Sequence, residues 1–175
     1  TYFQVFNALI NDPRLIEAAK KYGYRIKYVL HPIVSAQVND FDKNDYVDII
    51  PAVGDMSYET MFRESSLMVT DFSGIQFDFA YMRKPLVYLH HKDIPQHYEE
   101  GTFFYDTMAF GEIAHDNDEL IDLLCEYMAS GCKMKEEYVR RADDFFYYND
   151  HNNCKRIYDT MIEYQEKKIL PYRQK

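Results

Sequence analysis

The segment 67–89, LMVTDFSGIQFDFAYMRKPLVYL, constrains the fold more than any other part of the chain. It begins with an apolar run of strand length, turns at a serine and a glycine, continues with helical periodicity, and ends in a second apolar run, PLVYL. A helix between two strands is the usual crossover of a parallel pair. The segment therefore predicts strands at 67–71 and 85–89, with a helix from 73 to about 82 between them.

The same alternation of strand and helix patterns precedes this segment. Residues 11–23 have an Asx start, a proline in the first turn and a terminal glycine, which predict a short helix. Residues 24–30 alternate large apolar and basic side chains and predict a strand that ends at His31, which Pro32 holds extended. A further strand is expected at 46–50, and a helix opened by a hydroxyl cap at 57–66.

The C-terminal part of the chain shows mainly helical patterns. We expect a loop-rich stretch at 90–117 and a helical tail at about 117–168. Strands alternating with helices indicate an α/β fold with one parallel sheet of about four strands and helices on both faces. With 175 residues, 47% of them hydrophobic, and no low-complexity linker, we expect a single domain, 1–175.

Charge and composition exclude several classes of function. Twenty basic against 29 acidic residues give a net charge of -9, which argues against binding to nucleic acid or to anionic lipid. No apolar run is long enough to span a bilayer, so we expect the chain itself to be soluble. The three cysteines form no C-x-x-C pair, which favours reduced thiols in a cytosol and argues against a zinc site.

The turn between the strand at 67–71 and the following helix has the composition of an anion site. Ser73 and Gln76 fit a capping box, and Gly74 allows the backbone to approach a phosphate or diphosphate closely at the helix start. A purely structural interpretation fits equally well: Ser73 then caps the helix, while Thr70 and Asp71 tie down the turn. We expect backbone N–H groups to hold Asp71, because its charge would oppose a bound anion.

Asp78 has no cation among its helix neighbours. A carboxylate one turn beyond a phosphate-binding helix start is well placed to accept hydrogen bonds from two vicinal ribose hydroxyls. The alternative is a surface acid or an ion pair with Arg83 or Lys84. The sequence leaves both interpretations open.

The histidines divide into one candidate and several that carry little signal. His31 ends a strand at the carboxyl edge, where an imidazole can act as acid, base or phosphate ligand, although a histidine before proline is more often structural. For His90, His91 and His97, the sequence favours a solvated loop over a metal site, since no carboxylate pair lies at ligand spacing.

The order of these motifs resembles the C-terminal half of the CDP-glycerol glycerophosphotransferases, the teichoic acid polymerase family. That family has a pattern similar to T-D-[YF]-S-S-x-x-F-D-[FY]-A followed by K-[RK]-P. This sequence matches it at Thr70, Asp71, Phe72, Ser73, Phe77, Asp78, Phe79, Ala80, Lys84 and Pro85. Gly74 stands where the family usually has a second serine, and the resemblance covers roughly residues 24–162.

The resemblance implies a Rossmann-like domain corresponding to the C-terminal half of a GT-B fold. It implies binding of CDP-glycerol and transfer of glycerol phosphate to a lipid-linked acceptor in teichoic acid synthesis. We assign no cofactor and no metal-binding residue, and the sequence does not say whether a metal ion assists the reaction. His31 would then be the catalytic residue, with Thr70, Asp71, Ser73, Gly74 and Asp78 as substrate-binding residues. The full-length protein would lie in the cytoplasm, at the inner face of the cell membrane.

The resemblance also implies that this chain is a piece of a larger polypeptide. The family's second catalytic histidine, in an H-G-T motif, and the first strand of the C-terminal half have no counterpart here. We therefore expect donor binding with negligible turnover, and both acceptor and membrane contacts through the missing N-terminal half. CDP-ribitol, a nucleotide sugar, or a non-catalytic Rossmann-like interaction module remain alternatives.

Overall fold

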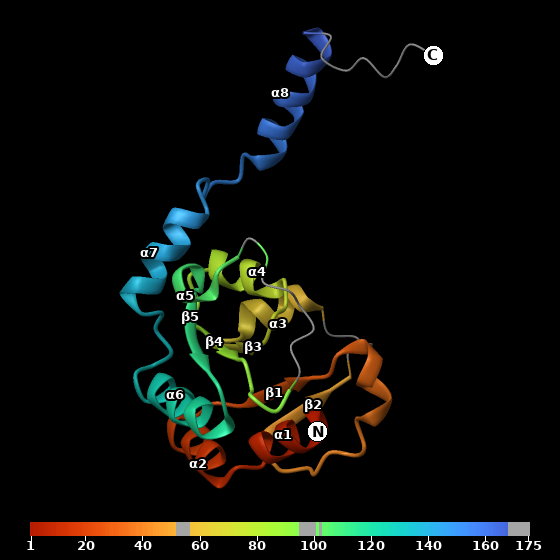
Figure 1. The fold of residues 1–175 in the computed structure, drawn as a ribbon, viewed down its shortest axis with the longest axis vertical. Coiled ribbons are helices and arrows are strands. Elements are labelled where there is room, and N and C mark those ends of the chain that lie inside the picture. Colours follow the sequence, from red (N-terminus) through yellow and green to blue (C-terminus); the bar gives the residue numbers. More distant parts are fainter. Residues whose placement is uncertain (52–56, 95–100, 102, 168–175) are drawn as a thin grey trace. The chain divides into compact units, whose positions relative to one another are not determined.

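The computed structural model describes residues 1–51, 57–94, 101 and 103–167 (Figure 1). They form two compact units, Thr1–Ala142 and Asp143–Lys175. The helices are α1 (Tyr2–Ile10), α2 (Pro13–Tyr22), the 3₁₀ helix η1 (Pro32–Gln37), α3 (Tyr58–Glu64), α4 (Ile75–Tyr81), α5 (Tyr105–Met108), α6 (Asn117–Ala129), α7 (Glu136–Phe145) and α8 (Asn153–Glu166). The strands are β1 (Ile26–Val29), β2 (Val47–Ile50), β3 (Met68–Thr70), β4 (Leu86–Leu89) and β5 (Gly111–Ala114).

The strands are parallel, as predicted, but they form two sheets rather than one. β1 pairs with β2, and β4 lies between β3 and β5 in the second sheet. The described residues contain five strands instead of the expected four or so. The additional strand, β5, lies in the stretch 90–117 that was interpreted as loop-rich, and so does the short helix α5. The sequence of β5, GEIA, contains only one β-branched residue and no regular alternation of apolar and polar side chains, so it shows no strand pattern by itself. Its pairing with β4 makes it a strand.

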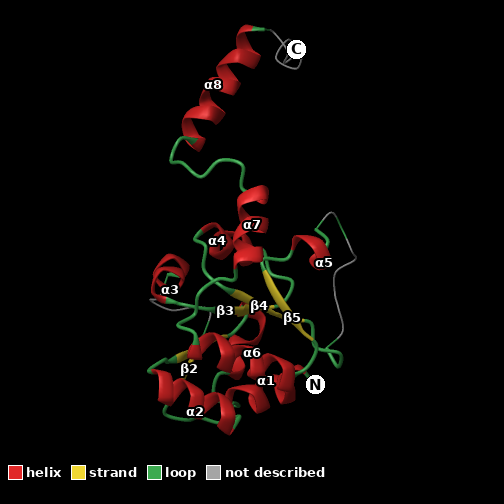
Figure 2. Cartoon of the chain, turned by 90° about the vertical axis from the view of Figure 1, so that its left-hand side faces the viewer, coloured by secondary structure: helices red, strands yellow, loops and turns green. Residues whose placement is uncertain are grey.

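Helices cover both faces of the second sheet, as expected for parallel strands. Figures 1 and 2 show α1, α2 and α6 on one side of β4 and α3 and α4 on the other. Val87 and Leu89 of β4 belong to the core cluster that includes α6, whereas Tyr88 between them bonds Gln76 of α4. Adjacent residues of β4 therefore serve opposite faces.

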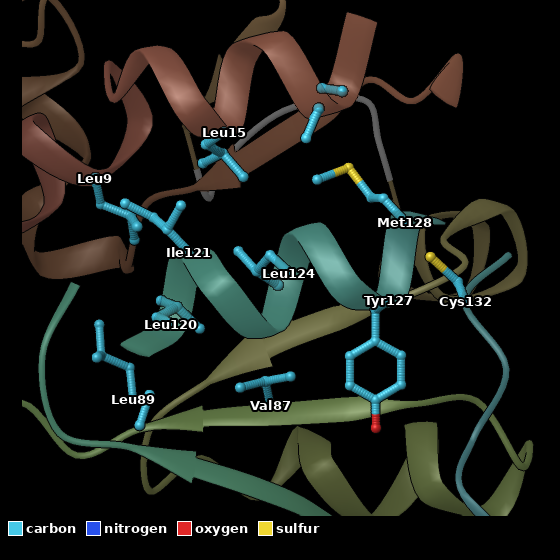
Figure 3. Close-up of a cluster of buried hydrophobic side chains, with 13 residues drawn as sticks. Leu9, Leu15, Val87, Leu89, Leu120, Ile121, Leu124, Tyr127, Met128 and Cys132 are labelled. Atoms are coloured by element: carbon cyan, nitrogen blue, oxygen red, sulfur yellow. The ribbon is translucent and has the colours of Figure 1, made fainter. Parts of the chain in front are cut away.

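The main core lies between α6 and its neighbours. Figure 3 shows side chains of α6 pointing both toward α1 and α2 and toward β4. The buried members of this cluster are Leu9, Leu15, Ala18, Ala19, Val87, Leu89, Ala114, Leu120, Ile121, Leu124, Tyr127, Met128 and Cys132. Burial of this apolar surface joins the N-terminal helices to the second sheet.

Helix ends follow the signals that the sequence carries. α2 begins after Asp12, whose side chain accepts from the Arg14 N–H, and ends at Gly23 in the left-handed conformation, φ 76°. The Ser57 side chain caps α3 by accepting from the Thr60 N–H. Both predictions are confirmed. α1 and η1 were not foreseen.

The first sheet has its own small core, which positions the end of β1. Ile10 of α1, Leu30, Phe41 and Val47 are buried together there. Leu30 comes directly after β1 and is almost fully enclosed, with 1% of its surface exposed. The chain leaves this core at the next residue, His31.

The second unit consists mainly of α8 and the turn before it. Asp150 pairs with Arg156 at 2.5 Å, and the Arg156 guanidinium lies 3.7 Å from the Tyr148 ring centroid. Large apolar side chains of α8, among them Ile157, Tyr158 and Met161, are exposed. Of the helices in the described ranges, none combines the length and apolar character needed to cross a membrane.

Candidate functional site

The turn after β3 presents several unused backbone donors. β3 ends at the buried Thr70, and the chain then turns through Asp71, Phe72, Ser73 and Gly74 before α4. The N–H groups of Ser73, Gly74 and Ile75 donate to no acceptor among the described residues. Successive free N–H groups in a turn form a concavity that suits an anion.

The capping box predicted for this turn is absent. The N-cap of α4 is Gly74, with no side-chain hydrogen bond to the helix. The Gln76 side chain is buried instead, where its Oε1 accepts from the Tyr88 hydroxyl at 2.8 Å and its Nε2 donates to the Tyr105 hydroxyl at 3.3 Å. The buried Tyr88 hydroxyl needs an acceptor more than the exposed helix start does. The Ser73 hydroxyl therefore has no hydrogen-bond partner within the described part of the chain.

Gly74 is not required by the packing of the protein itself. Its φ is -63°, which any residue adopts, and a Cβ placed there would meet no atom within 4 Å. The space beside the turn is therefore open. A ligand can approach the backbone at this position without displacing a side chain.

Asp78 is exposed on α4 and makes no hydrogen bond or ion pair with any described residue. The two basic side chains that the sequence offered as its ion-pair partners donate to backbone carbonyl groups instead. Arg83 Nη1 donates to the carbonyls of Ala80 and Tyr81. Lys84 Nζ donates to the carbonyls of Phe62, Arg63 and Ser65 at 2.7–2.8 Å. The ion-pair interpretation of Asp78 is therefore not what the structure shows.

Lys84 has a structural role at the end of α3. Its ammonium group satisfies three carbonyl groups there, which have no helical partner. Burial lowers its pKa. The lysine that precedes Pro85 in the K-[RK]-P pattern therefore holds α3 against the start of β4.

His31 is exposed at the carboxyl end of β1. Its backbone is extended, φ -62° and ψ 145°, as the following proline requires. Nδ1 accepts the Ile33 N–H at 3.3 Å, so the neutral ring carries its proton on Nε2 and presents a donor to solvent. No hydrogen bond, ion pair or ring contact among the described residues joins His31 to the turn after β3, and the two lie at the ends of strands in different sheets.

Asp71 differs from expectation. Its carboxylate is exposed and accepts no hydrogen bond from the described residues, so backbone N–H groups do not hold it. Its charge nevertheless acts on two neighbours. The pKa of Tyr2 is raised chiefly by burial and further by Asp71, and the pKa of His90 is lowered by burial against the opposing effect of Asp71. The negative charge of Asp71 therefore influences a side chain of α1 and one at the end of β4.

His90 was misinterpreted from the sequence as part of a solvated loop. It lies at the end of β4, partly buried, with its ring stacked on Phe72 of the turn. His91 is buried as well, and its Nδ1 accepts the Asp93 N–H at 3.1 Å. His97 lies outside the described residues. Phe72 and the aromatic segment at 103–105 were the signal that a packed aromatic site was present.

A metal site finds no support among the residues that the structure describes. No three histidine, cysteine, aspartate or glutamate side chains within those ranges are grouped so as to hold an ion. The donors available at the turn are N–H groups and a hydroxyl, and these are ligands for anions rather than for metal ions.

Comparisons with known proteins place the chain in a family. The model of the family CDP-Glycerol:Poly(glycerophosphate) glycerophosphotransferase matches residues 1–163. The minor teichoic acid biosynthesis protein GgaB of Bacillus subtilis (strain 168) is 40% identical over 168 residues, which are 96% of this chain and 18% of GgaB. The chain thus spans less than a fifth of that relative's length. No solved structure matches the chain.

The family match contains the whole of the turn, α4 and the end of β1 described above. It agrees with the resemblance that the T-D-F-S motif and the K-P strand predicted. On this extent of similarity, the chain belongs to the CDP-glycerol:poly(glycerophosphate) glycerophosphotransferase family.

Proposed function

We propose that this chain is the donor-binding domain of a glycerophosphotransferase, which binds CDP-glycerol for the synthesis of teichoic acid or a related cell-surface polymer. One observation carries the proposal. In a member of this family, a turn with three N–H groups that have no acceptor among the described residues precedes a carboxylate that has no partner among them either. The name of GgaB, a teichoic acid biosynthesis protein, supports the same polymer class.

The turn would hold the diphosphate. The free N–H groups of Ser73, Gly74 and Ile75 and the Ser73 hydroxyl supply four donors, and the open space at Gly74 admits the anion. The buried Thr70 anchors the turn to β3. Asp71 would stay away from the phosphates, since its negative charge repels them.

Asp78 would hold the ribose. An exposed carboxylate accepts two hydrogen bonds from vicinal hydroxyls without losing a protein partner, so binding costs no existing ion pair. Asp78 lies on α4, about one turn of helix after the phosphate-binding segment 71–74, and this position suits a sugar attached to the bound phosphates. The cytosine base has no binding residue that we assign.

The reaction would be a displacement at the β-phosphorus of CDP-glycerol. The oxygen of an acceptor hydroxyl forms a bond to this phosphorus, the bond to the bridging oxygen breaks, and cytidine monophosphate leaves with the electron pair. The turn donors would stabilise the leaving phosphate, and His31 would donate from Nε2 to a phosphate oxygen. The base that takes the proton of the acceptor hydroxyl would come from outside this chain.

The domain would form the C-terminal half of a GT-B enzyme, with residues 1–175 as one donor domain and its helical tail. The lipid-linked acceptor and the cell membrane would then be contacted by other parts of a full-length cytoplasmic protein. This chain alone would bind the donor but turn it over negligibly. The parallel strands covered on both faces support this architecture.

Isothermal titration tests the proposal, with CDP-glycerol, CDP-ribitol, CMP and UDP as ligands. We expect CDP-glycerol and CMP to bind, and the affinity for UDP relative to that for CMP shows whether the domain recognises the base. Asp78→Asn should raise the dissociation constant for CDP-glycerol by about tenfold or more, since a charge-assisted hydrogen-bond pair is lost. Asp122→Asn is the matched control, an exposed helical aspartate on α6, and should bind like wild type. Absence of binding by the folded chain, or equal affinity in both variants, would contradict the proposal.

A further inference from the structure

Three aromatic rings meet at the carboxyl end of β4, and we call them the ring cluster: Phe72, His90 and Tyr105. Phe72 and His90 stack in parallel, with ring centroids 4.1 Å apart and planes 13° apart. Tyr105 meets both edge-on, at 4.6 Å from His90 and 5.6 Å from Phe72. Stacked and edge-to-face pairs of this geometry attract beyond simple burial.

The ring cluster is tied to the second sheet by hydrogen bonds. The Tyr105 hydroxyl accepts from Gln76 Nε2, and Gln76 Oε1 accepts from the Tyr88 hydroxyl. Tyr88 in turn accepts the Phe110 N–H at 3.3 Å. The backbone N–H of His90 donates to the Ala114 carbonyl at 2.9 Å. β4, β5 and α5 therefore fix two of the three rings, while Phe72 belongs to the turn.

Hydrogen bonding by Nε2 does not explain why a histidine ring stands at position 90. Nε2 is buried and has no hydrogen-bond partner in the described structure. Burial lowers the pKa of His90, which favours the neutral ring. A neutral ring with an unbonded Nε2 stabilises its surroundings through the packing of its flat face, and that face lies against Phe72.

We propose that His90 is a positioning residue: by stacking on Phe72 it holds the turn 70–74 in the conformation that leaves the N–H groups of Ser73, Gly74 and Ile75 free. The role of the turn in binding the donor rests on the proposed function. The positioning of the turn by His90 does not. Among the described residues, His90 makes no hydrogen bond to these N–H groups. Its effect on binding passes through Phe72.

The experiment compares His90→Phe with His90→Leu in the 175-residue chain. Phenylalanine keeps a flat ring for the stack, whereas leucine keeps apolar volume without one. His115→Ala is the control, because this exposed histidine at the end of β5 makes no ring contact among the described residues. Two quantities are measured: the amide signals of Ser73 and Gly74 in ¹H–¹⁵N NMR spectra without ligand, and the dissociation constant for CDP-glycerol.

We expect His90→Leu to shift or broaden the amide signals of Ser73 and Gly74. The same variant should raise the dissociation constant for CDP-glycerol by about fivefold. His90→Phe should keep both signals near their wild-type positions and bind within about twofold of wild type, as should His115→Ala. Unmoved turn signals in His90→Leu would overturn the proposal. So would weak binding by His90→Phe with an undisturbed turn, since a ring nitrogen would then be needed.

The two proposals fail in different ways. If the wild-type chain binds no nucleotide, the proposed function fails, while the ligand-free amide signals still decide whether His90 positions the turn. If wild type binds CDP-glycerol and His90→Leu changes neither signals nor affinity, only the positioning role fails.

Discussion

Gly74 is where this chain departs from the usual serine of its family's pattern, and the structure shows that the position tolerates a side chain. Its φ of -63° is ordinary, and apart from the adjoining backbone no atom lies within 4 Å of a Cβ placed there. A serine would return one hydroxyl to the proposed diphosphate site without straining the turn. The position therefore tests the role of the turn without testing its stability.

For Gly74→Ser we predict tighter binding of CDP-glycerol, by about threefold to tenfold, because one more hydrogen bond reaches a phosphate oxygen. The free energy of unfolding should change by less than about 1 kcal/mol. Isothermal titration and urea unfolding measure the two quantities. Gly74→Ala adds the same Cβ without the hydroxyl, and equal affinity in the two variants would show that no phosphate lies there.

His90 predicts a specific dependence of stability on pH. Its pKa in the folded chain is lowered, first by burial and then by His115, while Asp71 opposes the shift. The unfolded chain therefore binds more protons, so this stabilisation is present above the unfolded pKa of about 6.5 and is lost as the pH falls below it. Between pH 7.5 and 5.5, His90→Phe should lose less stability than wild type in urea unfolding. The lowered carboxyl pKa values, those of Asp12, Asp116 and Asp150, act at lower pH and do not interfere. Parallel pH profiles would contradict the assignment.

At the residue level, the sequence indicated the polar members of the candidate site but not its aromatic support. Ser73, Gly74 and Asp78 could be singled out because hydroxyl, glycine and acid at a helix start have a known chemistry. The stack of His90 on Phe72 depends on which strand ends beside the turn, and local sequence does not contain that information. Gln76 was assigned to a cap for the same reason, since its buried partner Tyr88 lies on another element.

At the level of elements, β5 depends on one glycine. Gly111 pairs with Leu86 of β4, and a Cβ at Gly111 would lie 1.8 Å from the Leu86 carbonyl oxygen. No rotation of a side chain relieves a clash with backbone. The strand therefore requires glycine at its first position.

Gly111→Ala should destabilise the chain by about 3 kcal/mol or more, because β5 must move away from β4. The matched control is Gly101→Ala, where an added Cβ meets nothing within 4 Å and the expected change is below about 0.5 kcal/mol. Urea unfolding midpoints measure both. Similar midpoints for the two variants would mean that β4 and β5 separate at little cost.

Elements with strong end signals were predictable, and elements defined by tertiary pairing were not. Asp12, Pro13 and Gly23 mark both ends of α2, and the order of β3, α4 and β4 follows from one continuous segment. β5 has four residues and no alternation, so only its hydrogen bonds to β4 define it. The division of the strands into two sheets likewise depends on pairing distances that sequence does not encode locally.

At the scale of the whole molecule, the core lies in the first unit. Every buried side chain in the described ranges lies between Leu9 and Ala142, and α8 has none. A 14-residue helix without buried residues contributes little to the stability of a core. The first unit should therefore be stable without the residues that follow α7.

Truncation after Phe145 should leave the free energy of unfolding within about 1 kcal/mol of the complete chain. Far-ultraviolet circular dichroism would show the loss of helix from 153–166 and an unchanged cooperative transition for the rest. Loss of the transition, or a drop of several kcal/mol, would show that the second unit stabilises the first.

The structure of the chain bound to CDP-glycerol tests the central claim most directly. We predict the diphosphate within hydrogen-bonding distance of the N–H groups of Ser73, Gly74 and Ile75, with both ribose hydroxyls on the Asp78 carboxylate. Diphosphate bound elsewhere, with this turn empty and Asp78 in solvent, would contradict the assignment of the donor site.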